Sequence, residues 1–484
     1  MENAILFAPE LICLIMGLVL FFATVLNWSY RTTRGIAIAS GIAMVAACLW
    51  TLSLKGEPFF PGIYAVDFFS QLIKTALAVG FLFVVIASAN PLTVDRNGWL
   101  EVPLFFIFST LGMMMMVSAT ELLTLYVAME LAAYPVYIVV ALHRNTDIGG
   151  ESAAKYMVQG MAASAISLYG MSFLFGTFGS TYFSAISIPH AAAQPIFYLG
   201  LLLTLAGFFF KLGAFPFHFW APDTYETAPH PIITFIATVS KIAAIGILCR
   251  LLSLAMPGGW ESGHAQIALM WASVIAMSLG NLAALAQKDL KRLLGYSTVA
   301  HAGYVLLALQ TFAEWGLTAA LFYAIGYFAM SFACFLVICE IGRSEDRITI
   351  ESVSGLYKRA PFLSFTLLIG LFGLIGLPPT VGFVGKWFLF SAALQRGQFY
   401  LVLVAAINAA VALYYYLLII RQLYWVEPST QNTLKPTPLI AVTAMATIIL
   451  VIAMGTVPGP VWDMAALAAR ARVRGCCNKN IHQN

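Results

Sequence analysis

Long apolar segments recur along the chain, and they limit its fold more than any other feature. A helix that crosses a lipid bilayer needs about 20 apolar residues. Fourteen such segments are present, at 4–26, 35–54, 67–89, 102–118, 121–142, 153–177, 196–213, 230–254, 264–286, 291–310, 314–341, 361–394, 398–424 and 436–457. Only 10% of the 484 residues are charged, whereas soluble domains average about 25%. The sequence therefore predicts an all-α polytopic membrane protein with about fourteen transmembrane helices and no soluble domain of ordinary size.

Basic residues fall almost entirely in every second connection between these segments. Fourteen lie after odd-numbered segments, and two, Lys55 and Arg396, lie after even-numbered ones. Basic loops favour the cytoplasmic side of a membrane, so the odd-numbered connections are predicted in the cytoplasm and both termini outside. Four basic residues of the tail oppose this orientation, but they lie beyond the last segment, where the rule is weaker: Arg470, Arg472, Arg474 and Lys479.

Five basic residues lie inside the apolar segments instead of between them: Lys74, Lys211, Lys241, Arg250 and Lys386. A charged side chain at the bilayer centre costs about 2.5–3.5 kcal/mol on insertion scales, so each of these residues requires a partner, a wet cavity or a nearby surface. Lys74 and Arg250 lie close to the ends of their segments. They are expected to extend their charged groups to the membrane surface.

The three remaining lysines suggest proton transfer. Lys211, Lys241 and Lys386 lie deeper in the membrane or beside a helix break, and the carboxylate Glu130 lies in the middle of the fifth segment. One glutamate cannot neutralise three lysines, so at least one lysine must be neutral or stabilised by water. Burial and neighbouring cations favour the neutral amine, which a proton carrier requires. Alternatively, Glu130 and one lysine form a buried ion pair that only fixes helix packing.

Three histidines and a second carboxylate are further candidates. His301 lies within the tenth segment, while His218 and His230 flank the end of the seventh. A histidine in such a place can relay protons, or it can be an ordinary core residue. Glu121 begins the fifth segment and could instead serve as the carboxylate that a helix N-terminus favours.

No cofactor or metal site is predicted. Five of the seven cysteines lie singly in apolar segments, and no CxxC or dinucleotide-binding motif occurs. The net charge of +4 is small and scattered, without a run of five like charges, so nucleic acid is not an expected partner.

Glycine and proline interrupt two of the apolar segments. The seventh leads into KLGAFPFHFWAPDTYETAPHP, and the twelfth contains GLPPTVGFVGK. Paired interruptions of this kind point to inverted repeats with functional residues near the bilayer midplane. The predicted organisation is a three-helix segment at 1–101, inverted five-helix repeats at 102–255 (segments four to eight) and 264–425 (segments nine to thirteen), and a last span with a polar tail at 426–484.

Three long motifs resemble the antiporter-like membrane subunits of respiratory complex I. They are FFFKLGAFPFHFWAPDTYETAPHPIITFIATVSK at 208–241, KDLKRLLGYSTVAHAGY at 288–304 and GLPPTVGFVGKW at 376–387. The resemblance in hydropathy extends from about residue 5 to residue 457. The lysine at position 386, the stretch PDTYETAP and a length too short for extra spans favour the branch of this family called subunit N.

The resemblance implies a proton-translocating membrane-arm subunit of an NADH:quinone oxidoreductase in a bacterial inner membrane. FMN, iron–sulfur clusters and quinone would belong to other parts of the complex, and the partners would be neighbouring membrane subunits and lipid. By resemblance, Glu130 pairs with and tunes Lys211, Lys241 is the central proton carrier, His301 connects it onward, and Lys386 leads to the outer side. No role for Lys74 is implied.

Two other functions are compatible with the same residues. The chain could be a subunit of an Mrp-type cation/proton antiporter or of a related membrane-bound hydrogenase. It could also be a purely structural subunit, in which the buried charges are assembly contacts.

Overall fold

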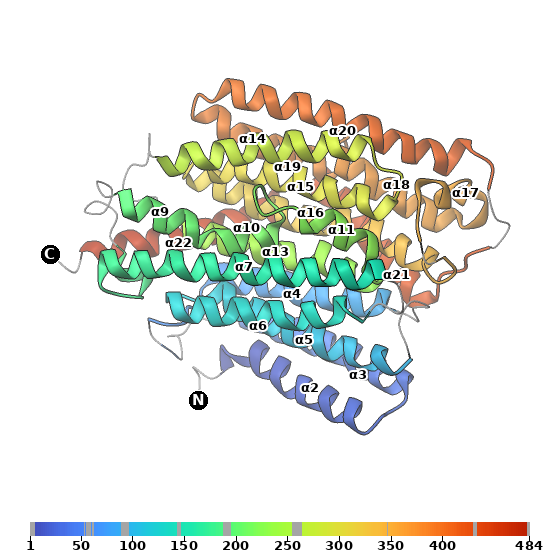
Figure 1. The fold of residues 1–484 in the computed structure, drawn as a ribbon, viewed down its shortest axis with the longest axis horizontal. Helices are drawn as coiled ribbons and strands as arrows, with labels where there is room; N and C mark the ends of the chain where they lie inside the picture. Colours follow the sequence, from blue (N-terminus) through green and yellow to red (C-terminus); the bar gives the residue numbers. More distant parts are fainter. Residues whose placement is uncertain are drawn as a thin grey trace.

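The structure, a computed structural model, describes residues 5–52, 54, 60, 62–88, 96–142, 147–186, 195–253, 264–345, 347–428 and 433–481. Across these residues the chain is almost wholly helical, and its β-type contacts are three isolated bridges such as Tyr64–Ala119. The long helices run roughly side by side, and α2 begins at the same end of the bundle at which α22 ends (Figure 1). The predicted all-α membrane fold is confirmed.

The helices follow one another in four groups. The first contains α2 (Ala8–Val25), α3 (Tyr30–Leu52) and α4 (Phe68–Ala87). The second contains α5 (Arg96–Ser118), α6 (Leu122–Val140), α7 (Asp147–Phe178), α9 (Pro195–Thr204), α10 (Ala206–Leu212), α11 (Trp220–Thr227), α12 (His230–Ala237) and α13 (Val239–Ser253). The third contains α14 (His264–Leu285), α15 (Leu290–Leu309), α16 (Glu314–Ile341), α17 (Leu356–Arg359), α18 (Pro361–Ile375), α19 (Val381–Gln395) and α20 (Phe399–Trp425). The last contains α21 (Pro438–Thr456) and α22 (Gly459–Ile481).

Each predicted segment overlaps one helix or two helices in series. In the described part of the chain, twelve spans are long and apolar enough to cross a membrane. The segment ends placed at residues 4, 89 and 254 lie outside the described residues. The two predicted breaks are confirmed, and the eighth segment has a further break at Thr238 that was not predicted. The inverted repeats and domain boundaries stay predictions.

The two predicted breaks have the same local cause. Helices α10 and α18 each end before a glycine with a left-handed backbone, Gly213 (φ 72°) and Gly376 (φ 89°). Glycine adopts this conformation at little cost and commonly terminates a helix. A proline follows each glycine three residues later, at Pro216 and Pro379, and it has no backbone N–H to continue the helix. Each break therefore leaves the last carbonyls of a half helix available to other donors.

Two spans form the interior of the bundle. In α16 and in the span formed by α12 and α13, 94% of the membrane-length window is buried, against 33% for α2 and 28% for α7. Helices that are apolar on all sides and buried on all sides belong to the core of a bundle. Both spans lie near the middle of the molecule in Figure 1. A charged residue on α13 is therefore enclosed by protein and not by lipid.

The last predicted span is present as α21, and the residues beyond it form a helix that was not predicted. Helix α21 stops at Thr456, but α22 begins at Gly459 and packs along α16 and α4. Trp462 packs against Phe388 of α19, with the ring centroids 4.1 Å apart, and Arg470 pairs with Glu314, the first residue of α16, at 2.7 Å. The last span therefore ends at Thr456, and the residues after it form the further helix α22.

The prediction that Lys74 and Arg250 reach the membrane surface is wrong. Both side chains are fully buried, and each has an acidic partner from a distant part of the chain. Lys74 Nζ lies 2.6 Å from Glu10 of α2, and Arg250 Nη2 lies 2.9 Å from Asp67, the N-cap of α4. The hydroxyl of Tyr64 also donates to Glu10. These ion pairs attach α2 to α4 and α4 to α13.

We expect Lys74→Met to destabilise the protein by about 3–5 kcal/mol, because it leaves the Glu10 carboxylate buried without its base. The double variant Glu10→Gln, Lys74→Met should regain most of this loss, since the amide still accepts from Tyr64. Thermal unfolding of the purified complex measures both effects. Equal melting temperatures for the single and double variants would contradict this account.

Candidate functional site

Lys241 lies on the core helix α13 and is held by backbone carbonyls. Its Nζ donates to the carbonyl oxygens of Lys211 and Leu212, both at 2.9 Å, which are the last two residues of α10. The ring of Trp220 lies 5.0 Å from the same nitrogen. The C-terminal end of a helix carries partial negative charge and an aromatic face attracts a cation, so both contacts stabilise the ammonium form.

Lys386 has nearly the same surroundings at the second predicted break. Its Nζ donates to the carbonyl oxygens of Leu374 and Ile375 at 2.9 and 2.8 Å, which are the last residues of α18. The ring of Tyr304 lies 5.0 Å away. The two broken helices therefore serve the same purpose, which is to present carbonyl groups to a lysine amine.

Glu130 and Lys211 are brought near each other but do not form an ion pair. Lys211 is buried on α10, and Glu130 lies on α6 close enough to interact with it electrostatically. Their charged atoms are more than 4.0 Å apart, and Glu130 Oε1 is buried without a hydrogen-bond partner. Lys211 also acts electrostatically on Lys241. The pairing implied by resemblance thus requires a movement of one of the two side chains.

His301 lies on α15 between the two lysines. Its Nδ1 shares a hydrogen bond of 2.5 Å with the hydroxyl of Tyr323, and its Nε2 lies 3.5 Å from the hydroxyl of Tyr416. Tyr304, one turn further along α15, has its ring 5.8 Å from the imidazole and also covers Lys386. His301 and Lys386 interact electrostatically. The tenth span therefore links the two lysine sites.

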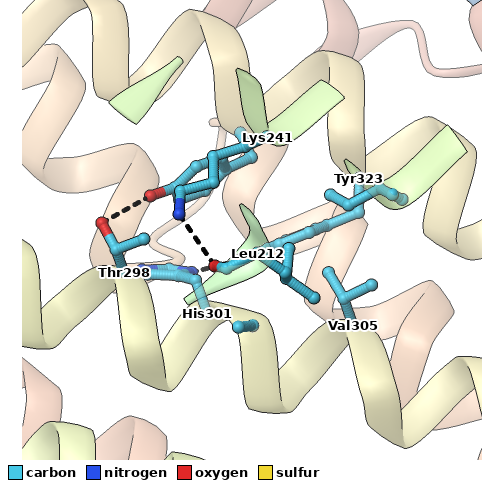
Figure 2. Close-up of a pocket in the computed structure, with 9 residues that line it drawn as sticks. Leu212, Lys241, Thr298, His301, Val305 and Tyr323 are labelled. Atoms are coloured by element: carbon cyan, nitrogen blue, oxygen red, sulfur yellow. Dashed lines mark hydrogen bonds between the residues drawn. The ribbon is translucent and has the colours of Figure 1, made fainter. Parts of the chain in front are cut away.

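A small cavity separates Lys241 from His301. It is lined by both residues together with Thr298, Tyr323 and Tyr327, and by apolar side chains. About 10 Å³ of it is open to the centre of a water molecule, which is close to what one bound water requires. Figure 2 shows His301 and Thr298 projecting from one helix toward Lys241, with Tyr323 facing His301. Two of the residues implied as proton carriers by resemblance, Lys241 and His301, therefore meet at a small cavity in the core.

Sequence reasoning missed the hydroxyl groups of this site. Thr298, His301 and Tyr304 follow one another at intervals of three residues in the motif GYSTVAHAGY. Residues spaced by three lie on one face of a helix, so the motif contained a signal for two of the missed residues. Tyr323 and Tyr327 on α16 show the four-residue spacing of one helix face, but nothing in the sequence relates that face to α15.

The other candidate residues lie apart from this cavity. His218 lies in the connection between α10 and α11, with its ring 4.2 Å from that of Phe219. His230 opens α12 and packs against Gly342 at the end of α16. Glu121 is the N-cap of α6 and accepts hydrogen bonds from the backbone and hydroxyl of Thr124 at 2.6 and 2.7 Å. The structure thus gives Glu121 the helix-capping position considered as its alternative.

A family model described as NADH:quinone oxidoreductase/Mrp antiporter, TM, matches residues 119–412, which include the whole site. The chain is 40% identical to NADH-quinone oxidoreductase subunit N 2 of Syntrophobacter fumaroxidans, over 97% of this chain and 99% of the relative. It is 33% identical to NADH-quinone oxidoreductase subunit N of Methylobacterium nodulans over 96% of each chain.

Solved structures agree with these relatives. A chain of respiratory complex I from Thermus thermophilus is 32% identical, with a TM-score of 0.82 over 95% of this chain and 99% of that one. A chain of the Mrp complex from Dietzia sp. is 19% identical with a TM-score of 0.86 over 99% of each chain, and it shares the fold.

Fold and site together define an antiporter-like membrane subunit, the class shared by NADH:quinone oxidoreductases and Mrp antiporters. Within that class, the chain belongs to the NADH-quinone oxidoreductase subunit N family of complex I, whose other membrane subunits are its partners. Complex I carries its FMN, iron–sulfur clusters and quinone on other subunits. Among the described residues of this chain, no group of three or more histidine, cysteine or acidic side chains could hold a metal ion.

Proposed function

We propose that the chain moves protons across a bacterial inner membrane through Glu130, Lys211, Lys241, His301 and Lys386, driven by quinone reduction elsewhere in the complex. One observation supports this most directly: Lys241 shares a cavity with His301, and no carboxylate of the described residues lies within 4.0 Å of its ammonium. A lysine held by carbonyls can lose its proton without breaking an ion pair. The charge distribution of the connections favours a cytoplasmic position for the odd-numbered connections and a periplasmic position for the termini.

Movement of Glu130 would supply the switch. When the carboxylate approaches Lys211, the pair is close to neutral and Lys241 can hold a proton. When it withdraws, the Lys211 ammonium repels the proton on Lys241. Two like charges about 10 Å apart interact by about 1.7 kcal/mol at an effective dielectric constant of about 20. That energy changes proton affinity by more than tenfold.

The proton then travels along α15. The N–H bond of Lys241 breaks and its proton joins a water in the cavity, while a proton of that water joins the imidazole of His301. The imidazole releases its other proton toward the neutral amine of Lys386, and Lys241 becomes the neutral amine. One proton has moved and no electron has been exchanged. Lys386 can release its proton to the outer side because its partners, like those of Lys241, are carbonyls.

Glu130→Gln tests the switch. The amide keeps the shape of the side chain but cannot neutralise Lys211, so proton translocation coupled to NADH oxidation should fall about tenfold, the effect of roughly 1.4 kcal/mol on a barrier. Proton uptake and quinone reduction are measured together in vesicles that contain the whole complex.

Glu101→Gln is the matched control, because Glu101 lies exposed at the start of α5. It should behave as the unaltered complex does. A Glu130→Gln complex that pumps at the same rate as the Glu101→Gln complex would exclude Glu130 from the mechanism.

A further inference from the structure

A group of buried hydroxyls meets the cavity from a direction that the path from Glu130 to Lys386 does not use. Thr298 Oγ1 lies 3.3 Å from the hydroxyl of Tyr225 and 2.9 Å from that of Tyr327. The three residues come from α15, α11 and α16 and are 3%, 0% and 5% exposed. Thr298 and Tyr327 line the cavity beside Lys241, whereas Tyr225 lies behind them. The hydroxyls therefore form a continuous chain from α11 to the cavity.

Thr298 is the branching point of this chain. Its hydroxyl carries one proton and can accept two hydrogen bonds, yet it has three oxygen neighbours, the third being the carbonyl of Leu294 at 2.9 Å. The Thr298 hydroxyl can donate to only one of these oxygens at a time. Its own oxygen can then accept a hydrogen bond from a tyrosine hydroxyl to which it does not donate. Rotation of this one O–H bond reverses the direction of donation, which is what a hydroxyl relay requires.

Tyr225, at the end of the hydroxyl chain away from the cavity, lies on α11, and this helix also reaches the protein surface. Asp223 and Glu226 of α11 are 29% and 23% exposed, and Arg292 of α15 bridges them at 3.0 and 2.8 Å. A Cβ atom at Gly295 would lie only 3.2 Å from Tyr225 Cβ, so α11 and α15 pack closely between the bridge and Thr298. Tyr225 thus lies on a short helix whose other residues reach the side with the odd-numbered connections.

We propose that Tyr225, Thr298 and Tyr327 form a second arm of the proton path, through which the cavity receives protons from the side of α11. The proposal rests on the proposed function. A water on the side of α11 gains a proton from the solvent and passes one to the oxygen of Tyr225, as the Tyr225 proton passes to Thr298. The Thr298 proton passes to Tyr327, and the Tyr327 proton passes through the cavity water to the neutral amine of Lys241. Each hydroxyl ends with one proton. Arg292 is a positioning residue that holds α11 in place.

Thr298→Val and Thr298→Ser separate a relay from a packing role. Valine keeps the shape and removes the hydroxyl, whereas serine keeps the hydroxyl and removes a methyl group. In vesicles containing the whole complex, proton translocation should fall at least about fivefold with valine, roughly the loss of one hydrogen bond in the barrier, and stay within about twofold with serine. Thr447→Val is the control, because its buried hydroxyl donates only to the carbonyl of Thr443 in its own helix.

Tyr225→Phe provides the second measurement and replaces the first if the Thr298→Val complex does not assemble. Phenylalanine should lower translocation to the level of Thr298→Val, and the double variant should lose no more than either single one, because both changes interrupt one chain. Equal losses with valine and serine, translocation like that of Thr447→Val, or normal translocation with Tyr225→Phe would overturn the proposal. If the Thr298, Tyr225 and Lys241 variants all pump normally, the proposed function fails. If the Thr298 and Tyr225 variants pump normally but the Lys241 variants do not, only the second arm fails.

Discussion

Replacing Lys241 with methionine is expected to lower proton translocation by roughly 100-fold, the lower end of what a positioned acid–base group contributes. Methionine has a similar length but no proton to give. Assembly should persist, because only the donor to the carbonyls of Lys211 and Leu212 is lost, and an unpaired buried carbonyl costs about 1–3 kcal/mol. Proton uptake and NADH oxidation are measured together in vesicles that contain the complex.

Lys241→Arg distinguishes proton transfer from a structural role of the same side chain. Arginine keeps the positive charge and can donate to the carbonyls of α10, but it does not lose its proton in a protein. It should therefore fail to pump while it restores the stability lost with methionine. Lys358→Met is the control, since Lys358 is partly exposed and pairs with Glu427 at the surface. A normal ratio of protons to electrons in Lys241→Arg would contradict the proposed function.

The positions of the main carriers could be predicted because their signals are local. Hydropathy located the spans, and glycine and proline located both breaks beside Lys211 and Lys386. A lysine or glutamate inside an apolar run stands out at once, whatever the helices around it do. The positions of the site residues along the sequence could therefore be predicted, although their arrangement in space could not.

The partners of these charges could not be predicted, because they come from remote parts of the chain. Lys74 and Glu10 are 64 positions apart, and Arg250 and Asp67 are 183 positions apart. Both acids lie near a segment end, where a carboxylate is usually read as a helix cap or a surface residue. Asp67 does cap α4, and the packing of α4 against α13 also makes it the partner of Arg250. Glu10 is instead fully buried against Lys74.

The lysine ligands were also hidden, for a different reason. Lys241 and Lys386 bind backbone carbonyls, which every residue has, so no side-chain pattern marks them. What marked them indirectly was the break itself, because a helix that ends in the membrane must satisfy its last carbonyls with some donor. A buried lysine near a glycine–proline break thus predicts that the lysine amine binds the last carbonyl groups of the broken helix.

The helix beyond the last span was not predicted, because the composition of the chain becomes polar after residue 457. Beyond 457 the chain contains charged residues, as a surface tail does, but Ala465, Ala468 and Ala469 are buried on one face of α22. Spacing of three and four residues is the mark of a helix with one packed face. These residues thus form a helix whose packed face consists of small alanine side chains, a signal that averaging over a long window conceals.

Gly382→Ala is expected to destabilise the complex by about 3 kcal/mol or more, at or beyond the upper end of what overpacking usually costs. A Cβ atom at this position would lie 1.7 Å from the carbonyl oxygen of Gly373, so the two halves of the twelfth span meet backbone to backbone. One of them must move. Because Lys386 lies one turn further along α19 and donates to Leu374 and Ile375, it would leave its carbonyl ligands.

Thermal unfolding and proton translocation of the purified complex measure the two consequences of Gly382→Ala, which should be a lower melting temperature and weaker pumping. Gly176→Ala is the matched control, because nothing lies within 4 Å of a Cβ at Gly176 in α7. There alanine should be neutral or stabilising by up to about 1 kcal/mol, its advantage over glycine in a helix. If both alanine variants melted at the same temperature, the close contact between α18 and α19 could not be what holds Lys386 against the end of α18.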